Sequence, residues 1–530
     1  MHQHKFLIFI LCFALAACGG GGSSSSAPEP ELEQELELEL EPESVFTGTL
    51  TGSILNFDTG EGIQSATVSV GGKVTTTASD GSYTLHNIAF SPRILVDISG
   101  TGFADNTKVT SLSTLASTNR LTVKLLPIDV TLNFDPSIQQ TIIDTGSPAS
   151  VSIPANGLVK NDGSSPDGDV TINLTVIDPT QDISLMPGEL LTAIAGSNLG
   201  TIESFGAITA TFTDASGNDL NLGSSSTSII RIPLADKTGN PPTAIPLYFY
   251  NKVTGLWVEE GTAILVQDGS DSYYEGTVSH FSTWNADFLY DQVFVDGCVQ
   301  DITGTRLTNI TVNSEGDDYA GSASTTTDTF GNFSVAVKPN ASALIFAEKN
   351  GERTNTTKVE MAAFDQQLDE CLILNIGGTS VGEVAVSIKL SWGENPSDLD
   401  SHLVGPNFHV SFGNQGSLIA SPFTQLDVDD IDSFGPEVIT IFSFETVGTY
   451  TYSVHDFSGL TTENASNTIT NSPARVELNV NGSTSVFVPP ASEGTNETWN
   501  VFEFVVAEDG SVIINTLNTW SPFSPLSVFD

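Results

Sequence analysis

From residue 46 onward, short runs of alternating apolar and polar residues are interrupted every few positions by Gly, Asn or Asp. Residues 66–70 (ATVSV) and 384–392 (VAVSIKLSW) alternate in this way, and Gly71-Gly72 directly follows the first run. A period of two places every second side chain on one face, as in a half-buried β-strand, and the interruptions are typical of turns. The pattern therefore predicts an all-β chain built from β-sandwiches.

Length and charge limit the domain count and the partners. At 530 residues the chain is long enough for three or four domains of about 150 residues each. It carries 17 Lys and Arg against 64 Asp and Glu, a formal net charge of −47. Nucleic acids and anionic lipid headgroups are bound through basic side chains, so this charge argues against both as partners. Divalent cations remain compatible with such a surface.

The amino terminus predicts a lipid anchor. Residues 15–18 (LAAC) close an apolar run that follows Lys5 and is too short to span a bilayer. This pattern resembles a bacterial lipobox. The resemblance implies that residues 1–17 are a signal peptide and that Cys18 is acylated, and Gly19 after the cysteine favours the outer membrane in such lipoproteins. An ordinary secretory signal is the alternative.

Residues 18–45 are expected to form a linker. Residues 19–26 (GGGGSSSS) lack side chains that could form a core, and residues 27–44 alternate Glu with Leu or Pro. Such a segment is expected to be extended and self-repelling. It would hold the folded part of the chain away from the membrane.

Two regions repeat one order of strands and turns. Residues 59–63 (TGEGI), 66–70 (ATVSV) and 78–85 (ASDGSYTL) resemble the carboxypeptidase regulatory-like domain, and strands are predicted at 66–70, 74–77, 83–85 and 94–98. A divergent copy has TDTFGNFSV at residues 327–335. The resemblance implies transthyretin-like β-sandwiches without catalytic residues at 46–127 and 292–376.

The cysteines predict one disulfide. Cys12 would leave with the signal peptide and Cys18 would carry lipid, so Cys298 and Cys371 remain as a pair around the second copy. In an oxidising compartment two such cysteines most simply bond to each other, and no neighbouring Cys or His suggests zinc spacing.

The other two regions carry weaker resemblances. Residues 128–291 include VSIPANGLV at 151–159 and SHFSTWN at 279–285, which resemble a segment of extracellular proteins of the cartilage intermediate layer type. Residues 377–530 combine a Trp-containing strand with PSDLD at 396–400 and GPE at 435–437, which resembles the YfaP-like bacterial envelope proteins. Both resemblances imply β domains and no defined chemistry.

The usual catalytic spacings are absent from the sequence. It contains no His-Glu-x-x-His, no Gly-x-Ser-x-Gly and no phosphate-binding Gly-x-x-x-x-Gly-Lys. His402, His409 and His455 accompany no serine in a recognisable nucleophile turn. We therefore expect a protein without enzymatic activity.

Carboxylates in the last region predict a calcium site. In an extended chain, Asp398 and Asp400 project from one face together with His402, and Asp427 and Asp429 repeat this spacing. Carboxylate oxygens suit Ca²⁺ better than zinc or copper. The alternative is that these aspartates are solvated turn formers, as many are in β proteins.

Together these features predict a non-enzymatic lipoprotein of the outer membrane that serves as a surface binding or structural module for an unidentified protein or glycan. Two alternatives stay open. One is a carbohydrate-binding surface protein, with Trp499 and Trp520 as candidate stacking residues. The other is an enzyme of unrecognised type in the C-terminal region that uses Asp398, Asp400 or Asp427.

Overall fold

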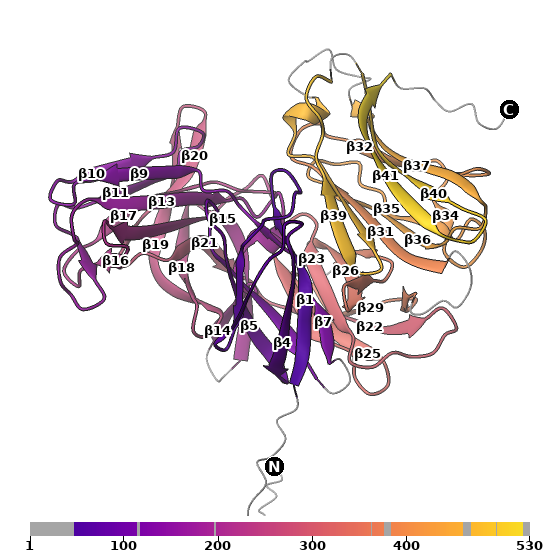
Figure 1. Cartoon of the computed structure of the whole chain (residues 1–530), viewed down its shortest axis with the longest axis horizontal. Helices are drawn as coiled ribbons and strands as arrows, with labels where there is room; N and C mark the ends of the chain where they lie inside the picture. Colours follow the sequence, from indigo (N-terminus) through magenta and orange to yellow (C-terminus); the bar gives the residue numbers. More distant parts are fainter. Residues whose placement is uncertain are drawn as a thin grey trace, which may run out of the picture. The chain divides into compact units, whose positions relative to one another are not determined.

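The computed structural model describes residues 47–113, 117–194, 198–361, 363–375, 383–458, 468–493 and 496–522. These residues form 41 β-strands and two short 3-10 helices, and no α-helix occurs among them, so the predicted all-β fold is confirmed (Figure 1). None of the described helices is long and apolar enough to cross a membrane. The predicted signal peptide (1–17), the lipid-bearing Cys18 and the linker (18–45) lie outside the described residues.

Eight strands form the first β-sandwich: β1 (Thr47–Asn56), β2 (Thr67–Val70), β3 (Lys73–Thr76), β4 (Ser82–Ala89), β5 (Ser91–Ser99), β6 (Asn106–Leu112), β7 (Thr118–Arg120) and β8 (Val123–Leu125). β1 pairs antiparallel with β4 and parallel with β7 and β8. The order β3-β2-β5-β6 makes the second sheet. Inward-facing side chains such as Leu50, Val68 and Val96 form the core between the sheets, as a period of two requires.

The middle region is one network of thirteen strands and a short helix: β9 (Val130–Phe134), β10 (Gln140–Ile143), β11 (Ser150–Ile153), β12 (Leu158–Lys160), β13 (Val170–Ile177), η1 (Ile183–Leu185), β14 (Leu191–Ile194), β15 (Asn198–Asp214), β16 (Asp219–Leu222), β17 (Ser228–Pro233), β18 (Ala244–Asn251), β19 (Leu256–Asp268), β20 (Asp271–Val278) and β21 (Thr283–Leu289). The pairing of β15 with β21 shifts register between Ser204 and Ala207. Gly206 lies within this irregularity at φ 116°, and a Cβ there would lie 2.3 Å from the Pro233 carbonyl oxygen. Glycine is therefore required at this position.

The third region has nine strands: β22 (Val293–Asp301), β23 (Thr311–Gly316), β24 (Ser322–Thr326), β25 (Asn332–Val337), β26 (Ser342–Lys349), β27 (Glu352–Arg353), β28 (Thr357–Glu360), β29 (Gln366–Gln367) and β30 (Leu372–Leu374). β22 pairs antiparallel with β25 and parallel with β29 and β30, which is the arrangement of β1 in the first sandwich. Cys298 in β22 forms a disulfide with Cys371, directly before β30, so the predicted cysteine pairing is confirmed.

The C-terminal region, orange to yellow in Figure 1, is a two-sheet β-sandwich. Its elements are β31 (Glu383–Ser391), β32 (Leu399–Val404), β33 (His409–Val410), β34 (Gly416–Ser417), β35 (Thr424–Val428), β36 (Glu437–Ser443), β37 (Gly448–Asp456), η3 (Ile469–Asn471), β38 (Arg475–Val480), β39 (Ser483–Phe487), β40 (Thr498–Val506) and β41 (Val512–Ser521). One sheet has the order β34-β35-β36-β31-β38-β39 and the other β33-β32-β37-β40-β41. Four large aromatic side chains, Trp392, Trp499, Phe502 and Phe504, are buried between them.

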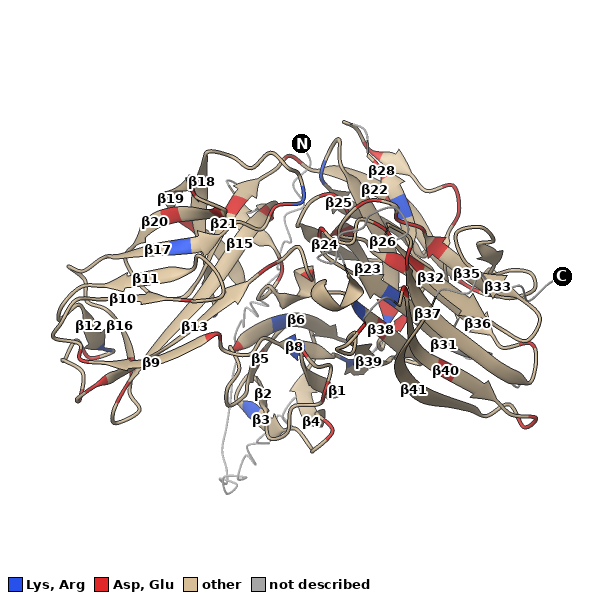
Figure 2. Cartoon of the chain, turned by 90° about the horizontal axis from the view of Figure 1, so that it is seen from above, with Lys and Arg blue, Asp and Glu red and all other residues tan. Residues whose placement is uncertain are grey.

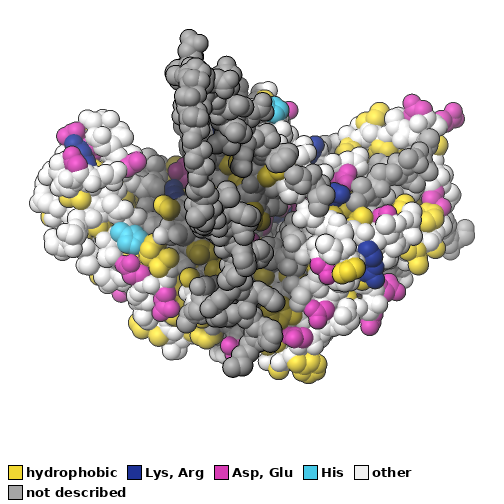
Figure 3. Space-filling model, turned by 90° about the horizontal axis from the view of Figure 1, so that it is seen from below, with side chains coloured by type: hydrophobic (Ala, Val, Ile, Leu, Met, Phe, Trp, Pro, Cys, Tyr) yellow, Lys and Arg dark blue, Asp and Glu magenta, His cyan; other side chains and the backbone are white. Residues whose placement is uncertain are grey.

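Residues 46–530 form one compact unit. Ion pairs join regions that are distant in the sequence: Lys124 contacts both Asp182 and Glu477, and Lys389 Nζ lies 2.7 Å from Glu315 Oε2. Elsewhere acidic side chains are spread over the strands and loops, with few basic ones between them (Figure 2). The space-filling view shows the same scatter of acidic groups on one face (Figure 3).

Candidate functional site

Strand β32 contains two polar residues, Asp400 and His402, on the face opposite to its leucines. Leu399 and Leu403 belong to the C-terminal core, and Asp400 and His402 alternate with them. All four residues are buried. Burial of polar side chains is unfavourable unless they meet polar partners, so Asp400 and His402 require polar neighbours.

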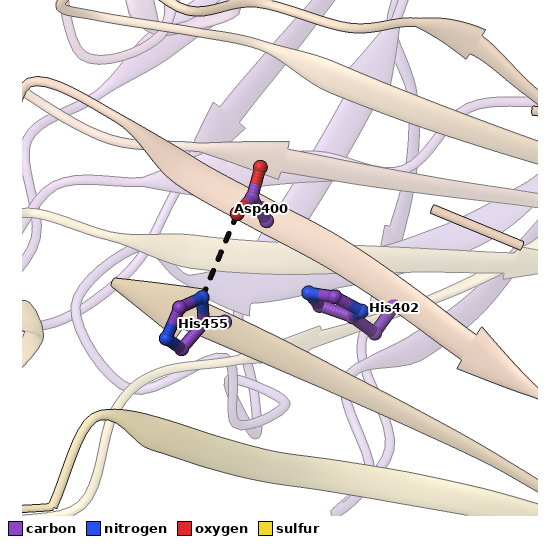
Figure 4. Close-up of side chains that lie close together, drawn as sticks. All are labelled: Asp400, His402 and His455. Atoms are coloured by element: carbon purple, nitrogen blue, oxygen red, sulfur yellow. Dashed lines mark ion pairs between the residues drawn. The ribbon is translucent and has the colours of Figure 1, made fainter. Parts of the chain in front are cut away.

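Asp400, His402 and His455 form the first polar group. β32 pairs antiparallel with β37, which places Asp400 directly opposite His455. One potential ligand atom from each of the three residues lies within 4.8 Å of the others. Figure 4 shows the His402 ring pointing toward His455, and one oxygen of Asp400 facing His455 while the other points away. The Asp400 Oδ2 to His455 Nδ1 distance is 3.5 Å, longer than a well-formed hydrogen bond.

A third imidazole supports His402. His402 Nδ1 and His409 Nε2 are 2.9 Å apart, and the two rings are stacked with centroids separated by 5.1 Å. Burial, together with the neighbouring His409 and His455 rings, lowers the pKa of His402 to about 3. His402 is therefore neutral at physiological pH, the form in which imidazole binds metal ions.

Asp400, Asp429 and Glu437 form the second polar group, and their potential ligand atoms again lie within 4.8 Å of one another. Glu437 is the first residue of β36, in the opposite sheet from Asp400, and is 1% exposed. Its Oε2 accepts a hydrogen bond from the Ser401 backbone N–H, whereas Oε1 has no hydrogen-bond partner among the described residues. An unpaired buried carboxylate oxygen is costly, because it has lost water without replacement.

Charge repulsion is visible in the pKa values around this group. Burial raises the pKa of Glu437 well above its usual value, and the nearby Asp400 and Asp429 add to the shift. Burial also raises the pKa of Asp398 to about 6, with further contributions from Asp400 and Asp429. Asp400 and Asp429 thus raise the pKa values of both Glu437 and Asp398, and a cation at this place would relieve the repulsion.

The structure brings Asp398, Asp400 and Asp429 into one neighbourhood but leaves Asp427 apart. Asp427 Oδ2 instead accepts hydrogen bonds from Thr440 Oγ1 at 2.6 Å and from the Thr356 backbone N–H at 3.0 Å. The pairing of β35 with β36 shifts register between Leu426 and Val428, and β35 ends at Val428. The alternation that would have placed Asp427 beside Asp429 is therefore interrupted.

Sequence reasoning missed Glu437 and His455 as members of the cluster. Both lie far along the chain from Asp400 and are brought to it by sheet pairing and by the approach of the two sheets. His402 did carry a signal, because it shares the period-two face of Asp400. His455 occupies an equivalent position in its own alternating strand, but its register could not be derived from local pattern.

Neither tryptophan proposed for sugar stacking is an open platform. Trp499 is 0% exposed and its Nε1 donates to Asn518 Oδ1 at 2.7 Å. Trp520 packs partly buried against the same core, and its Nε1 donates to the Pro490 carbonyl oxygen at 3.0 Å. Their role is that of core residues with satisfied N–H groups.

Comparisons with known proteins do not assign a family. No protein-family model and no curated protein matches the chain. Among solved structures, the Bacillus anthracis TIE protein is 12% identical, with 62% of this chain and 51% of that chain covered at a TM-score of 0.14. BcpA, the major pilin subunit of Bacillus cereus, is 9% identical, with 62% and 99% covered at a TM-score of 0.14. A putative membrane-associated protein from Bacteroides fragilis is 11% identical, with 46% and 98% covered at the same TM-score.

Proposed function

We propose that this protein is a non-enzymatic lipoprotein of the bacterial outer membrane and that its C-terminal β-sandwich is a calcium-stabilised binding or structural module. The lipobox-like LAAC at residues 15–18 and the linker that follows it support the location. The series of β-sandwiches supports a structural or binding role, because paired strands form a rigid scaffold from which loops can contact a ligand.

The observation that carries the calcium assignment is the group of Asp400, Asp429 and Glu437. Three carboxylates from separate segments converge within 4.8 Å, and one of them, Glu437, is fully buried with an unpaired oxygen. Solvated turn formers would point their oxygens to water instead. Ca²⁺ accepts several carboxylate oxygens at about 2.3–2.6 Å in flexible geometry, so it fits a group of this composition.

Such an ion would join the two sheets of the sandwich. Asp400 belongs to β32 in one sheet, Glu437 belongs to β36 in the other, and Asp429 lies in the segment that follows β35. A single ion bound to all three would fix the ends of these strands against one another. Its contribution is therefore expected in the stability of the C-terminal sandwich.

Thermal unfolding of the purified full chain tests this function, with chelator, Ca²⁺ or Mg²⁺ present. An ion that binds only the folded state at about 100 times its dissociation constant adds roughly 2.7 kcal/mol, which gives a clear rise in melting temperature. Mg²⁺ should have a smaller effect, because it dehydrates reluctantly and demands a tighter octahedron.

Two variants and one control make the result specific. Glu437→Gln and Asp429→Asn remove charge with little change in shape and should abolish the calcium-induced shift. Asp432→Asn changes an exposed carboxylate of the same loop and should keep the shift. Equal melting temperatures of the wild type with chelator and with Ca²⁺ would refute the calcium assignment.

A further inference from the structure

We infer that Asp400, His402 and His455 form a second metal site, which takes a divalent transition metal ion of the zinc class. This site goes beyond the calcium proposal. It shares Asp400 with the carboxylate group, but its other two ligands are the imidazoles of His402 and His455. Its ligand atoms lie within 4.8 Å of one another, and all three residues are buried.

The spacing of Asp400 and His455 fits two ligands of one tetrahedral ion. Zn²⁺ binds imidazole nitrogen and carboxylate oxygen at about 2.0–2.1 Å, so two ligands of a tetrahedral ion lie about 3.3–3.4 Å apart. Asp400 Oδ2 and His455 Nδ1 are 3.5 Å apart, and Asp400 Oδ2 accepts no hydrogen bond from the described residues. The pair is thus too far apart for a direct hydrogen bond and correctly spaced to bind the same ion.

The ligand types select against calcium. Imidazole nitrogen suits Zn²⁺, Cu²⁺ and Ni²⁺, whereas Ca²⁺ takes oxygen ligands. Two imidazoles and one carboxylate are also a ligand set found in zinc proteins, where three protein ligands leave a fourth position open. The two polar groups around Asp400 therefore differ in the metal that each prefers.

His409 acts as a positioning residue for this site. In the tautomer with a proton on Nδ1, His402 donates to His409 Nε2, 2.9 Å away, and its own Nε2 then carries the lone pair that a metal ion would take. Metal-binding histidines commonly donate their second ring N–H to such a partner, which fixes the tautomer and the ring orientation.

The strand pairing makes the site rigid. Asp400 and His402 are two residues apart on β32, and His455 is the cross-strand neighbour of Asp400 on β37. Paired strands hold their side chains more precisely than loops do. One Asp400 oxygen faces His455 and the other points away from it (Figure 4).

Zinc titration of the full chain in the presence of excess Ca²⁺ tests the site, with a chromogenic chelator as competitor. The wild type should bind one tight equivalent of Zn²⁺. His402→Ala and His455→Ala should each weaken binding by more than about a hundredfold, because loss of a direct ligand exceeds the roughly 10–100-fold effect of a supporting residue. His409→Ala should weaken zinc binding by roughly 10–100-fold. His86 is exposed and lies outside the site, so His86→Ala is the matched control and should leave zinc binding unchanged.

Zinc X-ray absorption of the wild-type protein gives an answer that does not depend on the variants folding. The expected spectrum contains scattering from two imidazole rings. A spectrum with oxygen ligands alone, or tight zinc binding that survives both histidine substitutions, would overturn the assignment. Glu437→Gln should abolish calcium stabilisation and keep zinc binding, so failure of one site is distinguishable from failure of the other.

Discussion

Asp400 is the residue on which both polar groups depend. It is 4% exposed, lies opposite His455, and is close enough to Asp429 and Glu437 for one ion to bind all three. Because both groups contain Asp400, a substitution there should change ion binding at both. Substitutions at other members should affect one group only.

Asp400→Asn and Asp427→Asn should therefore behave differently. The first should remove the calcium-induced rise in melting temperature, because it removes a central ligand charge. The second should keep it, because an amide oxygen at that position still accepts from the Thr440 hydroxyl and the Thr356 N–H. Differential scanning calorimetry with and without Ca²⁺ measures both, and a calcium shift lost in Asp427→Asn would contradict the observed geometry.

The buried Asp287 should make the stability of the middle region depend on pH. It is 0% exposed, and burial raises its pKa well above the usual value. The Asp287 carboxyl group has a pKa of about 3.9 in the unfolded chain and a higher pKa in the folded protein. At pH values between these two, the folded protein holds a proton that the unfolded chain has released. Stability should therefore fall as pH rises through this window, by at most about 1.4 kcal/mol per pH unit.

Asp287→Asn keeps the shape of the protonated carboxyl group and cannot ionise. Its melting temperature relative to the wild type should increase between about pH 5 and pH 8, because only the wild type loses stability. The exposed Asp271→Asn serves as control. A constant difference between Asp287→Asn and wild type across this range would show that Asp287 does not titrate as its burial implies.

At the scale of single elements, period-two patterns located strands well. The predicted runs 66–70, 74–77, 83–85 and 94–98 correspond to β2, β3, β4 and β5, with ends shifted by at most four residues. Register and bulges were not accessible in this way, because they depend on the partner strand. This is why the alternating pattern grouped Asp427 with Asp398 and Asp400, whereas the structure places Asp427 apart from Asp400 and brings Glu437 close to it.

The disulfide is expected to stabilise the third region, which contains β22 to β30. It joins β22 to the residue before its parallel neighbour β30 and closes a segment with a sequence separation of 73. For a loop of this length the chain-entropy model gives a stabilisation of about 4 kcal/mol.

Replacing both cysteines, Cys298→Ala with Cys371→Ala, should lower the temperature at which the third region unfolds. Thiol labelling of the denatured, non-reduced wild type should find neither cysteine free. Two reactive thiols in exported protein would contradict the bond.

At the scale of the whole molecule, the first and third regions share one pairing scheme around a central strand, β1 or β22. The sequence repeat indicated this similarity through the turns near Asp80 and Asp328. The thirteen-stranded middle network had no comparable local signal, because its order arises from pairing between distant strands. The net charge of −47 makes copies of the chain repel one another in solution.

The proposed membrane anchoring of the whole molecule depends on one residue, Cys18. Cys18→Ser should release the protein from membranes, because the segment that follows has Glu at every second position from Glu29 to Glu43 and is repelled by anionic headgroups. Membrane fractionation of cells that produce each form measures this. A processed Cys18→Ser protein that still sediments with the membrane would show that lipid on Cys18 is not the anchor.

The most direct test of the metal-binding account is a crystal structure grown with Ca²⁺ and Zn²⁺, with anomalous data collected above and below the zinc edge. We expect a zinc peak bounded by Asp400, His402 and His455, and a separate calcium density bounded by Asp400, Asp429 and Glu437. Water molecules in both places, with no anomalous signal and with the carboxylates paired to solvent, would contradict it.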